Sequence, residues 1–245
     1  MAYTTINKPE DYFKPVLYTG THSSVPTVTV GFKSDFLWLK SRTQTYDHNL
    51  LDTTRGVTKK IFSNKTQAES STGDSVTFNA TTFQPSGQAI NESGQGTDNM
   101  ISWNWKANGG TTSSNSDGTI TSTVQANTTA GFSIVTYTGT GSNGTVGHGL
   151  SKAPDCIFFK NYTATENWVT YHSVLGNSGG MYLNLTNSFN TASSWYQDQS
   201  PTSDYFYVGT NTKTNGGTMI AYCFTSIKGY SKFGSYTGNG NADGP

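Results

Sequence analysis

The chain has 245 residues, of which 12% are charged, and its formal net charge at pH 7 is zero with an isoelectric point near 6.9. Without a basic field to attract phosphates, nucleic-acid binding is not expected. The aromatic content of 13% argues against intrinsic disorder, and no apolar run approaches the roughly 18 residues of a membrane span. The first nine residues lack the basic start and apolar stretch of a secretory signal, so we expect synthesis in a cytoplasm.

The first part of the chain predicts a polar N-terminal arm, residues 1–14, followed by a module of short strands, residues 15–107. Short segments of β-branched and aromatic residues separated by Gly and Asn turns are typical of antiparallel strands. The expected strands are Val16 to Tyr18, Thr27 to Val30, Phe36 to Lys40, Asn49 to Leu51, Lys60 to Ser63, Val76 to Asn79, Thr82 to Gln84 and Met100 to Lys106. No segment shows convincing helical periodicity, and the best place for one helical turn is Asp52 to Lys59, where Thr53 is placed to cap it.

The rest of the chain predicts a linker, a second module and a tail. Residues 108–131 form the linker, which contains a strand at Thr119 to Val124, and residues 132–228 form the second module. In residues 229–245, the segment Phe233 to Gly240 repeats the opening of the second module. Either a third repeat begins here without being completed, or this C-terminal strand closes a sheet edge of its own or a neighbouring subunit. We favour the second alternative.

An internal repeat indicates that the two modules share one fold. Val16 to Thr21 returns as Val135 to Thr140, a shift of 119 positions (135 − 16), and Asp35 to Lys40 returns as Asp155 to Lys160, a shift of 120 (155 − 35). In Trp103-Asn104-Trp105 the two rings fall on one face, as the period of two in a strand requires. The sequence therefore predicts an all-β protein of two tandem antiparallel β-sandwich modules, jelly-roll or lectin-like, from an internal duplication.

Cysteine usage predicts no disulfide framework. Only two cysteines occur, Cys156 and Cys223, on two predicted strands of the second module. We expect both to be buried thiols in a protein made in a reducing cytoplasm.

A set of specific motifs extends over nearly the whole chain. They are Leu51 to Lys59, Ser113 to Ile120, Ala130 to Gly139, Val146 to Leu150, Ala153 to Asp155, Tyr171-His172 and Gly229 to Gly238. Together they resemble a domain family of uncharacterised proteins that is abundant in marine tailed bacteriophages. The resemblance implies a virion component such as a fibre, spike or capsid appendage, and it carries over no catalytic or binding residues.

Motifs for catalysis and metal binding are weak in this sequence. Gly176 to Gly180, with His172 just upstream, is similar to the nucleophile motif of chymotrypsin-like proteases, whose histidine lies far earlier in the chain and is held by a carboxylate. We interpret this segment as a turn. The histidines show no metal-ligand spacing: His22, His48, His148 and His172. We expect no enzyme activity, no metal and no cofactor.

Sugar binding is the chemistry that the sequence supports best. Exposed rings can stack on a sugar face while amides and carboxylates bind its hydroxyl groups. The candidate ligand or host-contact residues are Trp168, Trp195, Tyr196 and Asp198. Three of them lie in a loop-like stretch with no aromatic equivalent in the first module, and loops often carry binding function. The alternative is that these rings belong to a core or a subunit interface. The tryptophans on predicted strands are expected in the core: Trp38, Trp103 and Trp105.

The sequence thus predicts a bacteriophage virion structural protein, a tail fibre, spike or other appendage that contacts the host surface. Expected partners are further copies of the chain, as a trimer by analogy with other fibres, other virion proteins, and a host surface glycan or protein. One alternative is a capsid decoration or head-appendage protein without receptor binding. Another is a tailspike enzyme that degrades polysaccharide, with carboxylates such as Asp198 and Asp204 paired across loops.

Overall fold

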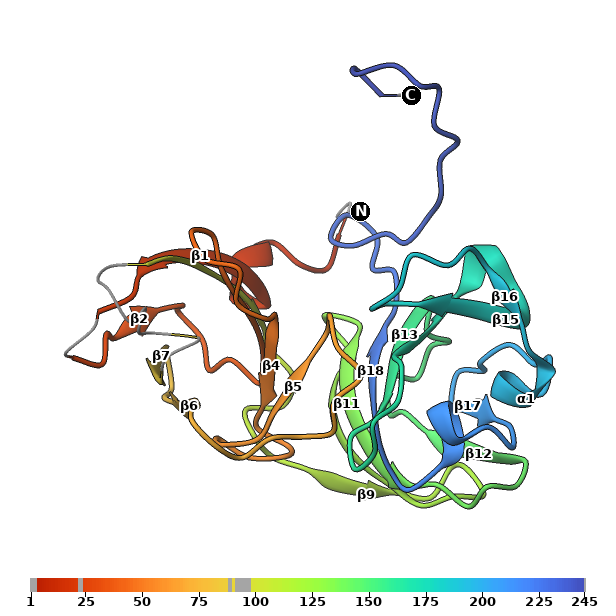
Figure 1. The fold of residues 1–245 in the computed structure, drawn as a ribbon. Coiled ribbons are helices and arrows are strands. Elements are labelled where there is room, and N and C mark those ends of the chain that lie inside the picture. The colour runs from red at the N-terminus through yellow and green to blue at the C-terminus, as the bar shows by residue number, and fades with distance from the viewer. Residues whose placement is uncertain (1–3, 22–23, 88–89, 91–97, 245) are drawn as a thin grey trace.

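The computed structural model of the chain describes residues 4–21, 24–87, 90 and 98–244. Within these ranges the regular structure is almost entirely β-strand, arranged in four sheets of antiparallel pairs, and each helix is a single turn (Figure 1). The predicted all-β class is confirmed. No helix in the described part of the chain is long and apolar enough to cross a membrane.

The first half, residues 4–107, consists of a five-stranded sheet with a three-stranded sheet packed on one face. The order of the larger sheet is β1 (Phe13–Thr19), β8 (Asn99–Trp105), β3 (Phe36–Ser41), β4 (Asn49–Asp52) and β5 (Lys60–Phe62). The order of the smaller sheet is β2 (Val28–Thr29), β7 (Thr82–Ser86) and β6 (Ser75–Phe78), and the 3-10 helix η1 (Pro9–Asp11) precedes β1. Leu37, Leu39 and Leu51 of the larger sheet meet Val76 and Phe83 of the smaller one in the first core.

The second half, residues 108–233, has an eight-stranded sheet and a two-stranded sheet. The order of the larger sheet is β16 (Asn190–Thr191), β15 (Gly176–Tyr182), β14 (Val169–His172), β13 (Cys156–Asn161), β18 (Thr218–Phe224), β11 (Phe132–Thr138), β10 (Ser122–Asn127) and β9 (Ser113–Asn115). The smaller sheet pairs β12 (Gly144–Gly147) with β17 (Tyr205–Val208), and three helical turns complete the half: η2 (Ser173–Leu175), α1 (Ser193–Tyr196) and α2 (Thr212–Asn215). A second core, which includes Val135, Phe159 and Phe206, fills the space beneath them.

The larger sheets of the two halves share a strand order and a register. The order β1-β8-β3-β4-β5 corresponds position by position to β11-β18-β13-β14-β15. Phe13 pairs with Trp105 in the first sheet, and Phe132 pairs with Phe224 in the second, so both members are 119 positions later (132 − 13 and 224 − 105). Corresponding strands therefore present corresponding positions to each face.

The two larger sheets also pack against each other through the faces that their smaller sheets leave open. Phe36, Leu50 and Ile61 of the first half meet Trp168 and Tyr222 of the second half in a third core. The rings of Phe36 and Tyr222 are stacked with centroids 4.2 Å apart. Figure 1 shows the two halves side by side, the first in red to yellow and the second in green to blue. The halves therefore form one layered body.

A buried polar network ties the halves together within this third core. Asp52 accepts hydrogen bonds from Arg55 Nε at 2.7 Å and from the hydroxyl of Tyr222 at 2.8 Å. Arg55 also pairs with Glu69 at 2.9 Å, and the Arg55 and Asp52 side chains are 2% and 0% exposed. Burial and the charge of Asp52 raise the pKa of Tyr222, so its hydroxyl keeps the proton that it donates. Because each buried charge has a hydrogen-bonded partner, the network fixes how the two sheets align.

The predicted helical turn at Asp52 to Lys59 is wrong, because this segment forms a turn without helix. Asp52 Oδ1 accepts hydrogen bonds from the backbone N–H groups of Thr54 and Arg55, while the hydroxyl of Thr53 donates to Asp35. A carboxylate that bonds the backbone two and three residues later stabilises a turn as readily as a helix start. Asp52, rather than Thr53, therefore organises this segment.

The predicted linker contributes two strands to one edge of the second sheet. Its strand begins later than expected, at Ser122, and β10 pairs with β11 in the register Ser122 to Tyr137. Strand β9 then pairs with β10. The pairing covers an edge of the second sheet, which satisfies backbone groups that a free linker would leave to water.

The predicted C-terminal strand is not formed in this structure. Residues 234–244, called the tail below, contain no strand and extend away from the body (Figure 1). The last pairing before them is an isolated bridge between Ile227 and Ser231. Within the described chain no strand lies beside the tail, so its backbone groups have no sheet to join.

The two predicted buried thiols are confirmed. Cys156 and Cys223 are free and buried, and burial raises the pKa of Cys156 to about 12. A thiol with so high a pKa is a poor nucleophile at neutral pH.

Lys160 is a fully buried lysine between the halves. Its Nζ donates to the backbone oxygen of Thr66 at 2.8 Å and to that of Glu166 at 2.5 Å. Burial lowers the pKa of Lys160 to about 8, and the charge of Glu166 offsets only part of this effect. The folded state therefore binds fewer protons at this site than the unfolded state at pH values between the two pKa values.

Lys160 consequently makes stability depend on pH. An unfolded lysine has a pKa of about 10.4, so the contribution of Lys160 should become more favourable as the pH rises from about 8 to about 10. In urea unfolding, the difference between wild type and Lys160→Met should change across this window. Lys152→Met removes an exposed ammonium and controls for the loss of one charge. A difference that stays constant from pH 7 to 10 would show that Lys160 keeps its ordinary pKa.

Candidate functional site

An aromatic groove of about 440 Å³ opens at one end of the core between the two halves. Its lining comes from strands of both larger sheets and from the segment just before the tail. The lining residues are Phe13, Trp38, Trp105, Ala130, Gly131, Phe132, Phe158, Phe224, Thr225, Tyr230, Ser231, Lys232 and Phe233. We call this surface the aromatic groove.

Sheet register explains why these rings gather at one place. Phe13 lies opposite Trp105 across β1 and β8, and Phe132 lies opposite Phe224 across β11 and β18. Directly opposite residues point to the same face of a sheet, so each pair faces the other sheet. Trp105 contacts Phe13 and Phe224 with ring centroids 4.7 and 6.1 Å apart, and Phe233 closes the end at 6.0 Å from Phe224.

The groove offers few polar groups. The indole Nε1–H of Trp38 is buried and has no acceptor among the described residues. Lys232 is the one charged residue of the described lining. Tyr230 packs edge-on against Tyr12 with centroids 6.3 Å apart, and burial raises the pKa of Tyr230 to about 12. The groove is therefore suited to apolar side chains.

The apolar surface continues beyond the groove along the first sheet. Pro15, Trp103 and Trp38 lie opposite one another across β1, β8 and β3, and Leu17 lies opposite Ile101 in a neighbouring row. Leu17 is 62% exposed, and the rings of Trp38 and Trp103 meet edge-on at 6.2 Å. Trp38 packs against the core between the halves, whereas Pro15 and Leu17 are exposed and Trp103 is partly exposed, so this part of the face remains open to a partner.

The structure corrects the aromatic part of the predicted ligand site. Trp168 is fully buried in the core between the halves, where its Nε1 donates to the backbone oxygen of Phe62 at 2.8 Å. Trp195 and Tyr196 are each 2% exposed and belong to the core of the second half. The expected loop at these two rings is the helical turn α1, which turns them inward. These rings cannot stack on a sugar in this conformation.

Asp198 is the one predicted site residue that is exposed. It lies in a polar cleft of about 440 Å³ lined by Asn143, Ser193, Ser194, Gln197, Asp198 and Thr210. Gln197 and Asp198 have φ values of 60° and 53°, a left-handed conformation that is uncommon for these residue types. The side-chain amide of Gln197 holds this segment in place by donating to the backbone oxygens of Gly144 and Val208, both at 2.9 Å. The polar cleft therefore has a fixed base of amide, hydroxyl and carboxylate groups.

Sequence reasoning placed the wrong tryptophans at the surface. Trp38, Trp103 and Trp105, expected in the core, are only partly buried and lie in or beside the aromatic groove. A signal was present in the run Phe36 to Leu39, which is apolar without alternation. Such a run indicates a strand that is covered on both faces, so its sheet must pack against a second partner. Where that partner covers the sheet only in part, aromatic side chains on that face remain exposed.

The remaining motifs have structural explanations. Gly176 to Gly180 is strand β15 rather than a turn, and a Cβ on Gly179 would lie 2.0 Å from the backbone oxygen of Asn190. His148 is buried, with Nδ1 accepting from the Leu150 N–H and Nε2 beside the Thr202 oxygen at 3.2 Å. Among the described residues no three His, Cys, Asp or Glu side chains form a metal-binding group, and His22 lies outside the described residues.

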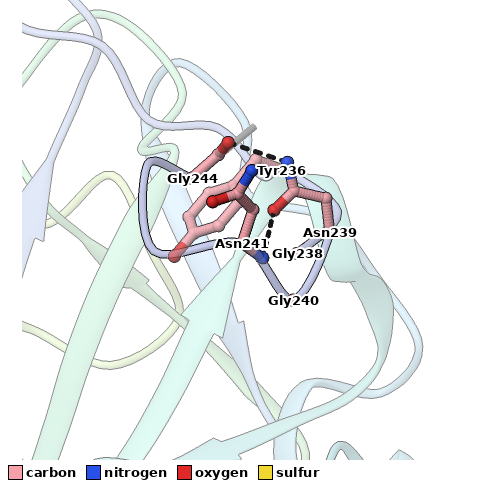
Figure 2. Close-up of a pocket in the computed structure, with 6 residues that line it drawn as sticks. All are labelled: Tyr236, Gly238, Asn239, Gly240, Asn241 and Gly244. Atoms are coloured by element: carbon pink, nitrogen blue, oxygen red, sulfur yellow. Dashed lines mark hydrogen bonds between the residues drawn. The ribbon is translucent and has the colours of Figure 1, made fainter.

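A further pocket of about 520 Å³ belongs to the tail alone. Figure 2 shows Tyr236 and Asn239 within a curl closed by a hydrogen bond from Asn239 Nδ2 to the Gly244 oxygen at 2.8 Å. Every lining residue lies between Tyr236 and Gly244. The pocket therefore depends on the conformation of one exposed segment, and we do not assign it as a ligand site.

The chain belongs to a family described as Domain of unknown function (DUF7483), whose profile matches residues 8–245. The match covers both halves and the tail. Neither a curated protein nor a solved structure matches the chain significantly.

The contrast between buried and half-buried rings predicts different costs of truncation. Trp195→Ala should lower the free energy of unfolding by about 3–5 kcal/mol, because it leaves a cavity in a closed core. Trp103→Ala should cost less than half as much, since its ring is partly exposed already. Urea unfolding of both variants measures the difference. Equal losses would mean that the apolar face around Trp103 is covered in solution.

Proposed function

We propose that this chain is a structural protein of a bacteriophage virion, part of a tail fibre, spike or other appendage. In this role it assembles with copies of itself, as a trimer by analogy with other fibres, and with other virion proteins, and it contacts the host surface. The observation that carries the proposal is the aromatic groove with its open apolar face. Contiguous exposed apolar surface on a soluble protein commonly marks a protein interface.

The chemistry of the aromatic groove favours a protein partner for it. Aromatic residues dominate the anchors of protein interfaces, and most of the lining residues of the groove are aromatic. Lys232 is the one charge among the described lining residues, so little charge must be desolvated when a partner binds. Assembly is therefore the function that we assign to the groove.

The polar cleft around Asp198 supports the host-contact part of the proposal. Asn143, Ser193 and Thr210 supply amide and hydroxyl groups of the kind that bind sugar hydroxyls. The described lining contains one carboxylate, Asp198, whereas glycoside hydrolysis ordinarily uses two. The cleft therefore favours binding of a host glycan over its hydrolysis, and we propose no catalytic role.

We further infer that the halves arose by internal duplication and that each is a β-sandwich of jelly-roll or lectin-like type. The common strand order of the larger sheets and the 119-position correspondence of their pairs support this origin. A duplicated sandwich provides two rigid copies of one scaffold, and loops on such scaffolds diverge readily. Host contact by the second half and assembly through the groove would then be separate duties.

The test is incorporation into particles of a phage that encodes this chain. Mass spectrometry of purified particles should detect the wild-type chain, and a Trp38→Ala/Trp103→Ala variant should be depleted at least tenfold. Leu185→Ser, which replaces another exposed apolar residue outside the groove, should be incorporated normally. Wild-type chain that is made in the infected cell but absent from particles would contradict a virion role.

A further inference from the structure

Strand β1 forms an outer edge of the first sheet, and no described residue pairs with that edge. The Gly20 N–H donates to Asp98 and the Lys106 N–H donates to Tyr12, so even-numbered positions of this strand bond β8. Alternate residues of an edge strand bond the neighbouring strand, and the residues between them direct their N–H and C=O groups away from it. The backbone groups of Leu17 and Thr19 therefore point outward from the sheet. Such an edge is a template for an added strand.

In the second sheet, the edge that corresponds to that of β1 is paired with another strand. Its corresponding strand, β11, is covered by β10 along the register from Ser122 and Tyr137 to Asn127 and Phe132. The pairing is antiparallel. The position that corresponds to Ile134 of β11 is Pro15 of β1, which has no N–H to donate. An added strand on β1 is therefore limited to the end of the strand that contains Leu17 and Thr19.

The tail carries a strand sequence without a sheet. Tyr-Thr-Gly occurs at Tyr18, at Tyr137 and again at Tyr236, and the first two Tyr-Thr pairs end β1 and β11. The Tyr18 hydroxyl donates to Ile90 and the Tyr137 hydroxyl donates to Thr214. Tyr236 is 80% exposed and lies in the tail curl of Figure 2.

The tail leaves the body at the wrong end of its own β1 for antiparallel pairing. Phe233 lines the aromatic groove, which also contains Phe13 at the beginning of β1, and Tyr230 packs against Tyr12 just before that strand. An antiparallel strand must enter at the Thr19 end, about 20 Å away at roughly 3.4 Å per residue. Tyr236 lies three residues after Phe233, within about 10 Å at the same rise. The tail of another molecule has no such limit and can enter at the Thr19 end of β1.

We propose that the tail of one copy adds as an antiparallel strand to the outer edge of β1 in a second copy. Residues Ser235 to Asn239 would bond the outward groups of Leu17 and Thr19, with Thr237 opposite Thr19 and Asn239 opposite Leu17, so that the side chains of Thr19 and Thr237 share one face. Strand addition of this kind joins copies of one protein through backbone hydrogen bonds. The proposal rests on the homo-oligomer of the proposed function and names the contact that forms it.

Mixed cysteine variants test this contact in the full chain. Thr19→Cys and Thr237→Cys chains, mixed and mildly oxidised, should give at least five times more disulfide-linked dimer than either variant alone. The native thiols are buried and do not compete. No excess of dimer in the mixture would overturn the proposal. A double variant that closes its disulfide within one chain would also overturn it, because the tail would then lie on its own β1.

Leu17→Pro provides an independent test of the backbone contact. It removes an outward N–H and no hydrogen bond within the sheet, whereas Leu17→Ala keeps the N–H and removes only the side chain. With both variants shown to be folded by thermal unfolding, sedimentation should show at least tenfold weaker self-association for Leu17→Pro than for Leu17→Ala. Equal association would overturn the proposal. Particle incorporation that still depends on Trp38 and Trp103 would leave the virion role intact, so the two proposals can fail separately.

Discussion

The structure depends on the packing of the two larger sheets against each other. Phe36 stacks on Tyr222 at 4.2 Å, and Tyr222 and Arg55 both bond the buried carboxylate of Asp52. Removal of any one partner would leave a buried polar group without its hydrogen bond. The alignment of the two sheets therefore depends on these hydrogen bonds and ion pairs as well as on apolar contacts. Each larger sheet thus packs against another sheet on both of its faces, and the first larger sheet is only partly covered on the face that meets the second.

This alignment also creates the candidate interface. The sheets overlap along part of their width, so the rings at one end remain partly open and line the aromatic groove. Beyond it, Leu17 is exposed and Trp103 is partly exposed on the same face of the first sheet. The groove and the open face therefore both result from the way the two sheets pack. The unpaired edge of β1 lies next to them on the same sheet. The polar cleft around Asp198 lies beside α1 and has a different chemistry.

The sequence predicted the strands better than it predicted their burial. The period of two in Trp103-Asn104-Trp105 correctly placed both rings on one face, and the apolar segments repeated at 119 or 120 positions correctly located the central strands. Burial failed because it depends on what faces a strand. Trp195 lies in a polar stretch, yet one helical turn directs it inward. The packing of one sheet on the other is a long-range contact that a local pattern does not encode, and it decides the environments of Trp168 and Trp38.

The most direct test of this account is the unfolding of each half in isolation. Residues 1–107 and 108–245, expressed separately, should unfold with low cooperativity and bind a hydrophobic dye, because each exposes the face that carries Phe36 or Tyr222. Mixing the two should restore a cooperative transition close to that of the full chain. Two halves that each unfold cooperatively, with stability unaffected by the other, would contradict the account and describe independent tandem modules instead.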